Sequence, residues 1–333
     1  MDKIKNSPNF RNGAFQNLST TPMMAEGVST FKILRDFLNK PKSVNPPGPL
    51  PSVQTNLKEL SSDKPTVIWF GHSSYLININ GINVLVDPVF SGSAAPISSL
   101  VKAFPGSNEY GPKDMPATID YMVLTHNHYD HLDKKTMVEL NQRTKQYIVP
   151  LGVAANLKNW SIGKERIIEM DWWESNQLSP YISITSTPAR HFSGRGFKRG
   201  GSLWTSYLLN IFGFTIYIGG DSGYDLHFAE IGKAAGEIDL AILECGQYNA
   251  YWPYIHMQPE EVVQAYIDLG AKMLLPVHWG KFALAYHAWN EPIIRVTTKA
   301  AEKGVPIATP RIGEPLVING SNPSKAWWLD IAG

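Results

Sequence analysis

The chain has few of the residues that would cross-link it or anchor it in a bilayer. It contains a single cysteine, Cys245, which excludes an internal disulfide and a thiolate-rich metal site. No run approaches the ~18 consecutive apolar residues of a membrane span, and Met1–Thr21 lacks the apolar core of a secretory signal. We therefore expect a cytoplasmic protein, and peripheral contact with a membrane stays open.

The chain also has almost no excess of positive over negative charge. The net charge is +1 and no block of like charges occurs, whereas a surface that binds a polyanion needs a basic stripe. We therefore do not expect a nucleic acid partner. With 43% hydrophobic and only 18% charged residues, the composition is that of a folded globular protein.

The first 64 residues differ in pattern from the rest. Apolar residues at spacings of three and four predict a short helix over 31–38. A proline-rich stretch follows over 41–51, which predicts an extended arm. We expect residues 1–64 to form an N-terminal extension that straps over one main domain, residues 65–333.

From residue 65 onward, strand patterns come first and helices alternate with strands later. Asn80-Gly81 predicts a tight hairpin turn, since both residues tolerate a positive φ. The expected strands are 66–70, 75–79, 82–87, 119–125, 146–150, 166–170, 181–187, 203–210, 214–220, 239–244 and 272–277. The expected helices are 134–142, 152–160, 227–235, 259–269 and 291–303. Two strand-rich stretches, each followed by helices, indicate two packed sheets with helices outside.

The strongest chemical signal is a histidine cluster directly after the expected strand 119–125. His126, His128, Asp130 and His131 lie within six residues of one another. Imidazole nitrogen and carboxylate oxygen are preferred ligands of zinc and similar divalent ions. Residues two apart on an extended chain point the same way, so His126 and His128 can hold one ion together, while Asp130 and His131 turn towards a second. The cluster therefore predicts a metal centre.

This motif resembles the H-x-H-x-D-H signature of the metallo-β-lactamase superfamily. Four further segments follow the family order and carry Asp87, His191, Asp221 and His278. Within the superfamily, His-Asn-His-Tyr-Asp-His-Leu and Gly-Asp-Ser-Gly-Tyr are similar to the branch of N-acylphosphatidylethanolamine-hydrolysing phospholipase D and its bacterial relatives. The resemblance spans about two thirds of the chain, residues 65–280. It implies an α/β fold, a four-layer αββα sandwich with an N-terminal extension.

The resemblance also implies a ligand set for two divalent ions. The first ion would be held by His126, His128 and His191, and the second by Asp130, His131 and His278. Asp221 would bridge both ions, because a carboxylate offers two oxygens. Asp87 would brace the ligand loop without touching an ion. We expect zinc first, with manganese and iron as alternatives, since the same nitrogen and oxygen ligands accept all three.

Several residues outside this set are candidates for the substrate site. His256 matches a motif that supplies a histidine beside the substrate phosphate in the phospholipase branch, so we count it with Asp130 as catalytic. His72 is either a site residue or a structural histidine, and we expect His227 and His287 to be solvated or to cap a helix. An aromatic stretch offers a surface for an acyl chain or a cap on the core, with the candidates Tyr248, Tyr251 and Trp252. A basic loop around His191 either attracts an anionic headgroup or is simply solvated, with the candidates Arg190, Arg195, Lys198 and Arg199.

The resemblance implies a metal-dependent hydrolase that uses a hydroxide shared by the two ions. The leading hypothesis is a phosphodiesterase of phospholipase D type that acts on N-acyl phosphatidylethanolamine or a similar phospholipid. The alternative hydrolase is a lactonase for a phosphorylated sugar lactone. A di-iron oxidoreductase on the same fold is a third hypothesis, although such proteins carry Glu where this chain has Asn127. The substrate, the oligomeric state and the role of residues 1–64 stay open.

Overall fold

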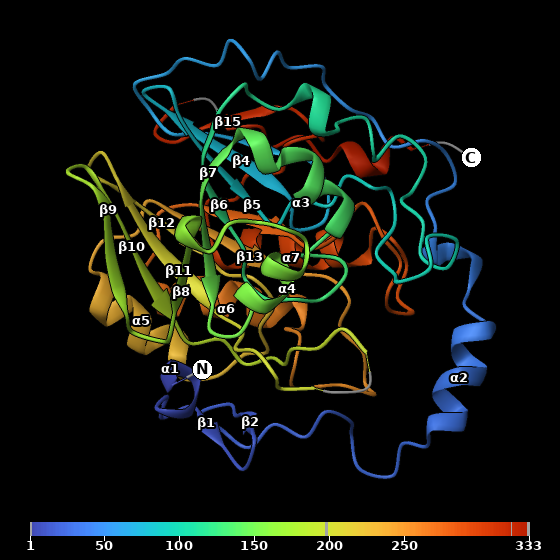
Figure 1. Cartoon of the computed structure of the whole chain (residues 1–333). Helices are drawn as coiled ribbons and strands as arrows, with labels where there is room; N and C mark the ends of the chain where they lie inside the picture. Colours follow the sequence, from blue (N-terminus) through green and yellow to red (C-terminus); the bar gives the residue numbers. More distant parts are fainter. Residues whose placement is uncertain (1, 197–198, 321, 332–333) are drawn as a thin grey trace.

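The computed structural model describes residues 2–196, 199–320 and 322–331, and its centre consists of two mixed sheets (Figure 1). One sheet has seven strands in the order β15-β3-β4-β5-β6-β7-β8, and the other has six in the order β14-β13-β12-β11-β10-β9. A single hydrophobic cluster contains buried side chains from both sheets. Two sheets packed on one core, with helices outside, form the four-layer αββα sandwich that the resemblance implied.

The seven-stranded sheet combines an antiparallel half with a parallel half. β3, β4 and β5 are antiparallel neighbours, and β4 and β5 are joined by the hairpin turn at Asn80-Gly81. β5, β6, β7 and β8 run parallel, and these need crossover connections. The strands are β3 (Thr66–Trp69), β4 (Tyr75–Ile79), β5 (Ile82–Val86), β6 (Ile119–Val123), β7 (Thr144–Pro150), β8 (Ile167–Met170) and β15 (Pro315–Val317).

The six-stranded sheet repeats this plan. β9 to β12 are antiparallel, and β12, β13 and β14 run parallel. The strands are β9 (Ser175–Ser179), β10 (Ile182–Thr187), β11 (Ser206–Ile211), β12 (Phe214–Ile218), β13 (Leu240–Glu244) and β14 (Leu274–Val277).

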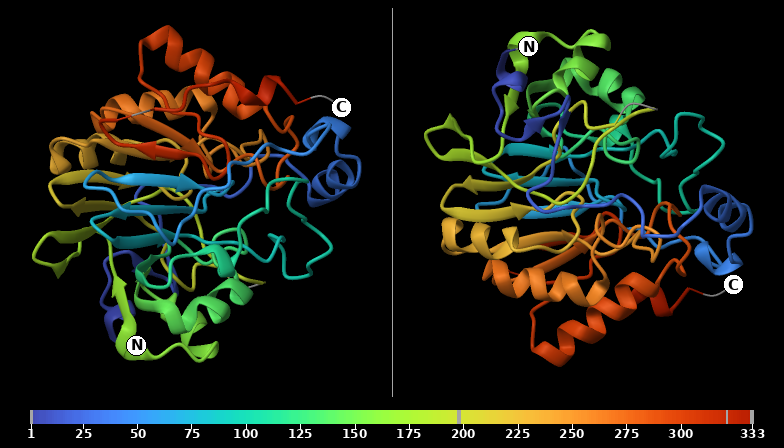
Figure 2. Two further views of the ribbon diagram at one scale, coloured as in Figure 1. Left: turned by 90° about the horizontal axis from the view of Figure 1, so that it is seen from above. Right: turned by 90° about the horizontal axis from the view of Figure 1, so that it is seen from below.

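The crossovers supply the outer helices, which lie on opposite sides of the strands (Figure 2). The sequence of α6 explains where this helix begins and ends. Pro259 occupies its first position, and Gly270 follows its last residue in the left-handed conformation. The helices are α3 (Lys134–Leu140) and α4 (Ala154–Asn159) on one side, and α5 (His227–Ala235), α6 (Pro259–Leu269) and α7 (Glu291–Lys303) on the other. Short 3-10 turns cover Lys42–Val44, Pro112–Asp114, Asn141–Arg143, Lys164–Arg166 and Trp327–Leu329.

The N-terminal segment contacts the sandwich at several separate places. It contains α1 (Asp2–Lys5), a small hairpin of β1 (Phe10–Arg11) and β2 (Ala14–Phe15), and α2 (Thr30–Leu38). Phe15 packs against Trp172 and Trp204, and Leu50 and Leu57 enter the main core. The boundary at residue 64 stays a prediction.

The elements agree with the sequence patterns apart from their ends and a few short strands. Strands expected at 203–210 and 272–277 begin later, at Ser206 and Leu274. β9 was not expected, because its residues Ser-Asn-Gln-Leu-Ser are half-buried or exposed at a sheet edge and show no apolar alternation. β1, β2 and β15 are too short to leave a periodic signal.

Candidate metal centre

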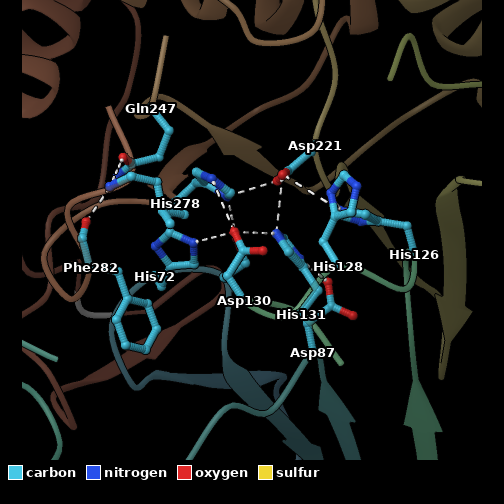
Figure 3. Close-up of polar contacts among 12 residues, drawn as sticks. His72, Asp87, His126, His128, Asp130, His131, Asp221, Gln247, His278 and Phe282 are labelled. Atoms are coloured by element: carbon cyan, nitrogen blue, oxygen red, sulfur yellow. Dashed lines mark hydrogen bonds and ion pairs between the residues drawn. The ribbon is translucent and has the colours of Figure 1, made fainter. Parts of the chain in front are cut away.

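The predicted ligands all follow strand ends and meet in one place, and Figure 3 labels all of them except His191. The loop with His126 to His131 follows β6, and His191 follows β10. Asp221 comes three residues after β12, and His278 comes directly after β14. Both sheets therefore contribute to a single site, and all seven of these side chains except that of His128 are buried.

The first group consists of three histidines whose ring nitrogens converge. Nε2 of His126 lies 2.9 Å from Nδ1 of His128, and Nε2 of His191 lies 3.3 Å from the same atom. The other ring nitrogens of His126 and His191 each have a hydrogen-bond partner on the side away from this group. Nδ1 of His126 lies 3.0 Å from the Thr125 hydroxyl, and Nδ1 of His191 lies 2.8 Å from the carbonyl oxygen of Ile255.

The second group surrounds Asp130. Its Oδ2 lies 3.5 Å from Nε2 of His131 and 3.9 Å from Nε2 of His278. His72 completes this group, because its Nε2 lies 3.0 Å from the same oxygen and its side chain is fully buried. These four residues offer ligand atoms within 4.8 Å of one another. His72 is therefore placed in the site.

Asp221 lies between the two groups. Its Oδ1 is 2.7 Å from Nδ1 of His278, and its Oδ2 is 3.1 Å from Nε2 of His131. The same Oδ2 is 3.7 Å from Nε2 of both His126 and His191. Gly220 allows this approach: its φ is +60°, and a Cβ there would lie 2.9 Å from Cβ of Thr125.

The donor atoms fit cations, because two of them have no other partner. Among the described residues, Nε2 of His128 and Nε2 of His278 have no hydrogen-bond partner although both atoms are buried. Buried polar atoms are almost always hydrogen-bonded, so orphaned atoms that face one small volume indicate a missing ligand. The mixture of imidazole nitrogens and carboxylate oxygens suits zinc and comparable ions.

The electrostatics of the site point the same way. Burial lowers the pKa of His128 to about 4 and that of His278 to about 3, so both imidazoles are neutral with free lone pairs. Burial opposes ionisation of Asp130 and Asp221, but His131 and other neighbours hold the pKa of both carboxyls well below the usual range. Burial alone would lower the pKa of His131, but Asp221 and Asp130 raise it well above its ordinary value. The two carboxylates therefore favour positive charge beside them, which a cation at this site would supply.

Asp87 braces the ligand loop, as its predicted role requires. Its Oδ1 accepts a hydrogen bond from the backbone N–H of Thr125, and its Oδ2 accepts one from the Thr125 hydroxyl. Nδ1 of His131 lies 2.8 Å from the same Oδ2. Asp87, His72 and His278 all have positive φ angles, 40°, 53° and 67°, which non-glycine residues adopt mainly where the surroundings force them.

His256 reaches the same site from the loop before α6. Its Nδ1 lies 3.1 Å from both carboxylate oxygens of Glu244, the last residue of β13. Burial alone would lower the pKa of His256, but Glu244 outweighs it and raises that pKa to about 9. Glu244 was missed in the sequence because it ends an apolar run. A fully buried carboxylate needs a partner, and that is the signal that could have found it.

A pocket of about 320 Å³ opens above the candidate metal ligands. His256, Trp252, Phe192 and Arg199 contribute to its wall. Three residues of the N-terminal segment also line it, although no sequence motif pointed to them: Met23, Met24 and Ile33. Trp252 therefore lines the pocket, and its role as a substrate residue stays a prediction.

Other predicted substrate residues do not line this pocket. The Tyr248 hydroxyl donates to Glu291, and Tyr251 contacts Asp36 of α2 through its hydroxyl. The Arg190 guanidinium turns towards the N-terminal segment and donates to the carbonyl oxygen of Thr20 and the hydroxyl of Thr21.

Among the remaining basic and histidine candidates, Arg195, His227 and His287 have hydrogen-bond partners within the protein. Arg195 donates to the carbonyl oxygen of Asn127 and stacks on Tyr129, with 3.9 Å to the ring centre. Lys198 lies outside the described residues. His227 begins α5 beside Ser222, and His287 accepts the backbone N–H of Gln247, so both histidines are hydrogen-bonded inside the protein and are not the solvated or capping residues that we expected.

Two packed mixed sheets with a histidine and aspartate cluster at their strand ends define the class of metallo-hydrolases. A model of the family described as "Beta-lactamase superfamily domain" matches residues 82–279. The chain belongs to this superfamily and is a metal-dependent hydrolase of the metallo-β-lactamase fold. None of the helices in the described residues is long and apolar enough to cross a membrane.

Three relatives illustrate the breadth of the similarity. An uncharacterized protein of Mycobacterium tuberculosis is 38% identical over 332 residues, covering 97% of this chain and 87% of that protein. N-acyl-phosphatidylethanolamine-hydrolyzing phospholipase D 1 of Caenorhabditis elegans is 31% identical over 234 residues, covering 65% of this chain and 64% of that protein. A metallo hydrolase of Ignicoccus hospitalis shares the fold at a TM-score of 0.59 and 18% identity, covering 78% of this chain and all of that structure.

Proposed function

We propose that the chain is a binuclear phosphodiesterase of phospholipase D type. In this proposal His126, His128 and His191 hold one divalent ion, and Asp130, His131 and His278 hold the other, with Asp221 shared between them. The observation that carries the proposal is the position of Asp221, whose two oxygens lie within 3.7 Å of nitrogens from both groups. Zinc is the ion that we propose first.

Two such ions, when bound, lower the pKa of a water towards neutrality and accept charge that develops on a phosphoryl oxygen. Asp130 orients that water, and its own orientation is fixed by His72 at 3.0 Å. His256 holds a proton for the leaving alcohol. Glu244 engages Nδ1 of His256 and leaves Nε2 available to the pocket.

The proposed substrate is an N-acyl phosphatidylethanolamine or a similar phospholipid. The similarity to the phospholipase D of Caenorhabditis elegans supports this class. The chemistry of the pocket also supports it, because apolar walls of Met23, Met24 and Ile33 suit an acyl chain. Arg199 at the same pocket supplies a guanidinium for the phosphate. We propose a cytoplasmic protein that works at the surface of a membrane.

The proposal is tested by identifying the products that the protein releases from two substrates. Purified, metal-loaded protein is given N-acyl phosphatidylethanolamine and, separately, a phosphorylated sugar lactone. We expect release of phosphatidic acid and an N-acylethanolamine from the lipid, since the bond on the distal side of the phosphate breaks. Opening of the lactone without release of phosphatidic acid would overturn the proposal.

A further inference from the structure

The outward face of α2 is apolar. On a helix with 100° between residues, Phe31, Leu34 and Leu38 fall on one face. Their exposed fractions are 75%, 56% and 74%, which is unusual for large apolar side chains on a water-facing surface. In Figures 1 and 2, α2 stands at the edge of the molecule, clear of the two sheets.

The opposite face of α2 fixes this orientation. Ile33 lines the pocket above the candidate metal ligands, and its carbonyl oxygen accepts a hydrogen bond of 3.1 Å from the Tyr286 hydroxyl. Asp36 contacts the Tyr251 hydroxyl. Because the inner face is held by these contacts, the helix cannot roll to hide its apolar side chains.

A second segment extends the apolar surface. Leu100 and Phe37 line one shared hollow of about 460 Å³, and the backbone N–H of Leu100 donates to the carbonyl oxygen of Ile97 in the same loop. Ile97 and Leu100 are each 60% exposed, and Phe37 is 42% exposed. We call these six residues the α2 surface: Phe31, Leu34, Phe37, Leu38, Ile97 and Leu100.

The rim of the α2 surface is basic. Lys32, Arg35, Lys42 and Lys102 are all exposed, although the whole chain carries a net charge of only +1. Asp36 is the one acidic residue between positions 30 and 45, and it is half-buried and paired with Arg35. An apolar surface with a cationic rim complements a bilayer with anionic headgroups.

We propose that the α2 surface docks the protein on an anionic phospholipid membrane, so that lipid enters the metal pocket past Ile33. The inference rests on the proposed function for the identity of the lipid substrate. A second copy of the chain fits the surface less well, because a two-fold interface would oppose the same basic residues to one another. The position of α2 accounts for the proposed path of the lipid from the membrane to the pocket. Ile33, on its inner face, lines the pocket, whereas its apolar outer face is exposed.

The experiment measures vesicle binding separately from turnover. Metal-loaded, full-length protein is sedimented with vesicles of phosphatidylcholine alone and of phosphatidylcholine mixed with phosphatidylserine. We expect binding to the mixed vesicles, and at least a tenfold loss in a variant with Phe31→Ser, Leu34→Ser and Leu38→Ser. Lys32→Gln with Lys42→Gln should weaken binding to the mixed vesicles by about fivefold for each residue. Turnover of a small soluble phosphodiester should not change in either variant.

The matched control removes apolar side chains of similar exposure elsewhere. Leu18→Ser with Leu226→Ser should bind vesicles as the natural chain does, since these residues are 56% and 75% exposed but line a different hollow, together with Pro188 and Asp225. Equal loss in the control, no vesicle binding by the natural chain, or a dimer that the triple variant dissociates would each overturn the docking proposal. Vesicle binding without hydrolysis of any phosphodiester would instead sink the proposed function and leave the docking proposal standing.

Discussion

Asp87 and His131 lie 2.8 Å apart, Oδ2 to Nδ1, although they come from the ends of two different strands, β5 and β6. The same carboxylate accepts two hydrogen bonds from Thr125, the residue before the ligand loop. A carboxylate behind a metal-ligating imidazole fixes both the ring orientation and the tautomer.

Asp87→Asn should therefore weaken metal binding by about 10- to 100-fold while the ligands themselves remain. Competition with a chelator measures this loss. Asp120→Asn is the control, because Asp120 is also buried and accepts a backbone N–H, that of Asn83, but lies away from the site. Equal metal loss in both variants would mean that Asp87 only stabilises the fold.

Asp221→Asn should lower the metal content from about two ions per chain to about one and abolish turnover. An amide oxygen carries no full charge, so it cannot balance cations on both sides. Elemental analysis and phosphodiester turnover measure the two effects. Full activity in this variant would remove Asp221 from its proposed position between the ions.

Glu244→Gln should lower kcat by about 100-fold with little change in KM, because His256 loses the partner that holds its proton. The effect should vanish when His256 is already Gln, since Glu244 is proposed to act through that ring. A similar loss of kcat in the His256→Gln background would show that Glu244 acts elsewhere, for example through the backbone N–H of Ser222 that it accepts.

Lys281 supports a prediction about stability and pH. Burial lowers its pKa from 10.5 to about 7, and the two carbonyl oxygens that it contacts, of Phe70 and Val89, can be satisfied by a neutral amine. Between these two pKa values the unfolded chain binds the extra proton, so stability rises with pH.

The free energy of unfolding of the natural chain, minus that of Lys281→Met, should therefore increase from pH 7 to 10.5, by up to about 1.4 kcal/mol per pH unit. Urea unfolding at several pH values across that range measures the difference. A difference that stays constant, or falls, would show that Lys281 keeps its proton when buried.

Four of the candidate ligands could be recognised in the sequence because their pattern is local and their chemistry is narrow, whereas His191, Asp221 and His278 were predicted from the family resemblance. His126, His128, Asp130 and His131 occupy one short loop. Most of the strands could be predicted for a similar reason, since they are rich in apolar residues.

The walls of the pocket could not be predicted, because they depend on contacts between distant parts of the chain. Met23 and Arg199 meet at 3.1 Å across the pocket, yet they are 176 residues apart and neither belongs to a periodic pattern. Arg190 was only a candidate for the substrate site, because the direction in which a side chain leaves an irregular loop is set by the backbone and its neighbours. Here the carbonyl oxygens of Thr20 and Tyr224 draw the guanidinium away.

The origin of the donors in both sheets has a mechanical consequence. Ions bound between His131, after β6, and His278, after β14, would link the two sheets at this edge, in addition to hydrogen bonds such as that from the backbone N–H of His278 to the carbonyl oxygen of His72. Removal of the ions by a chelator should then loosen the contact between the two sheets first at this edge. Amide hydrogens in the loops after β6, β12 and β14 should exchange faster before those in the middle of the strands do.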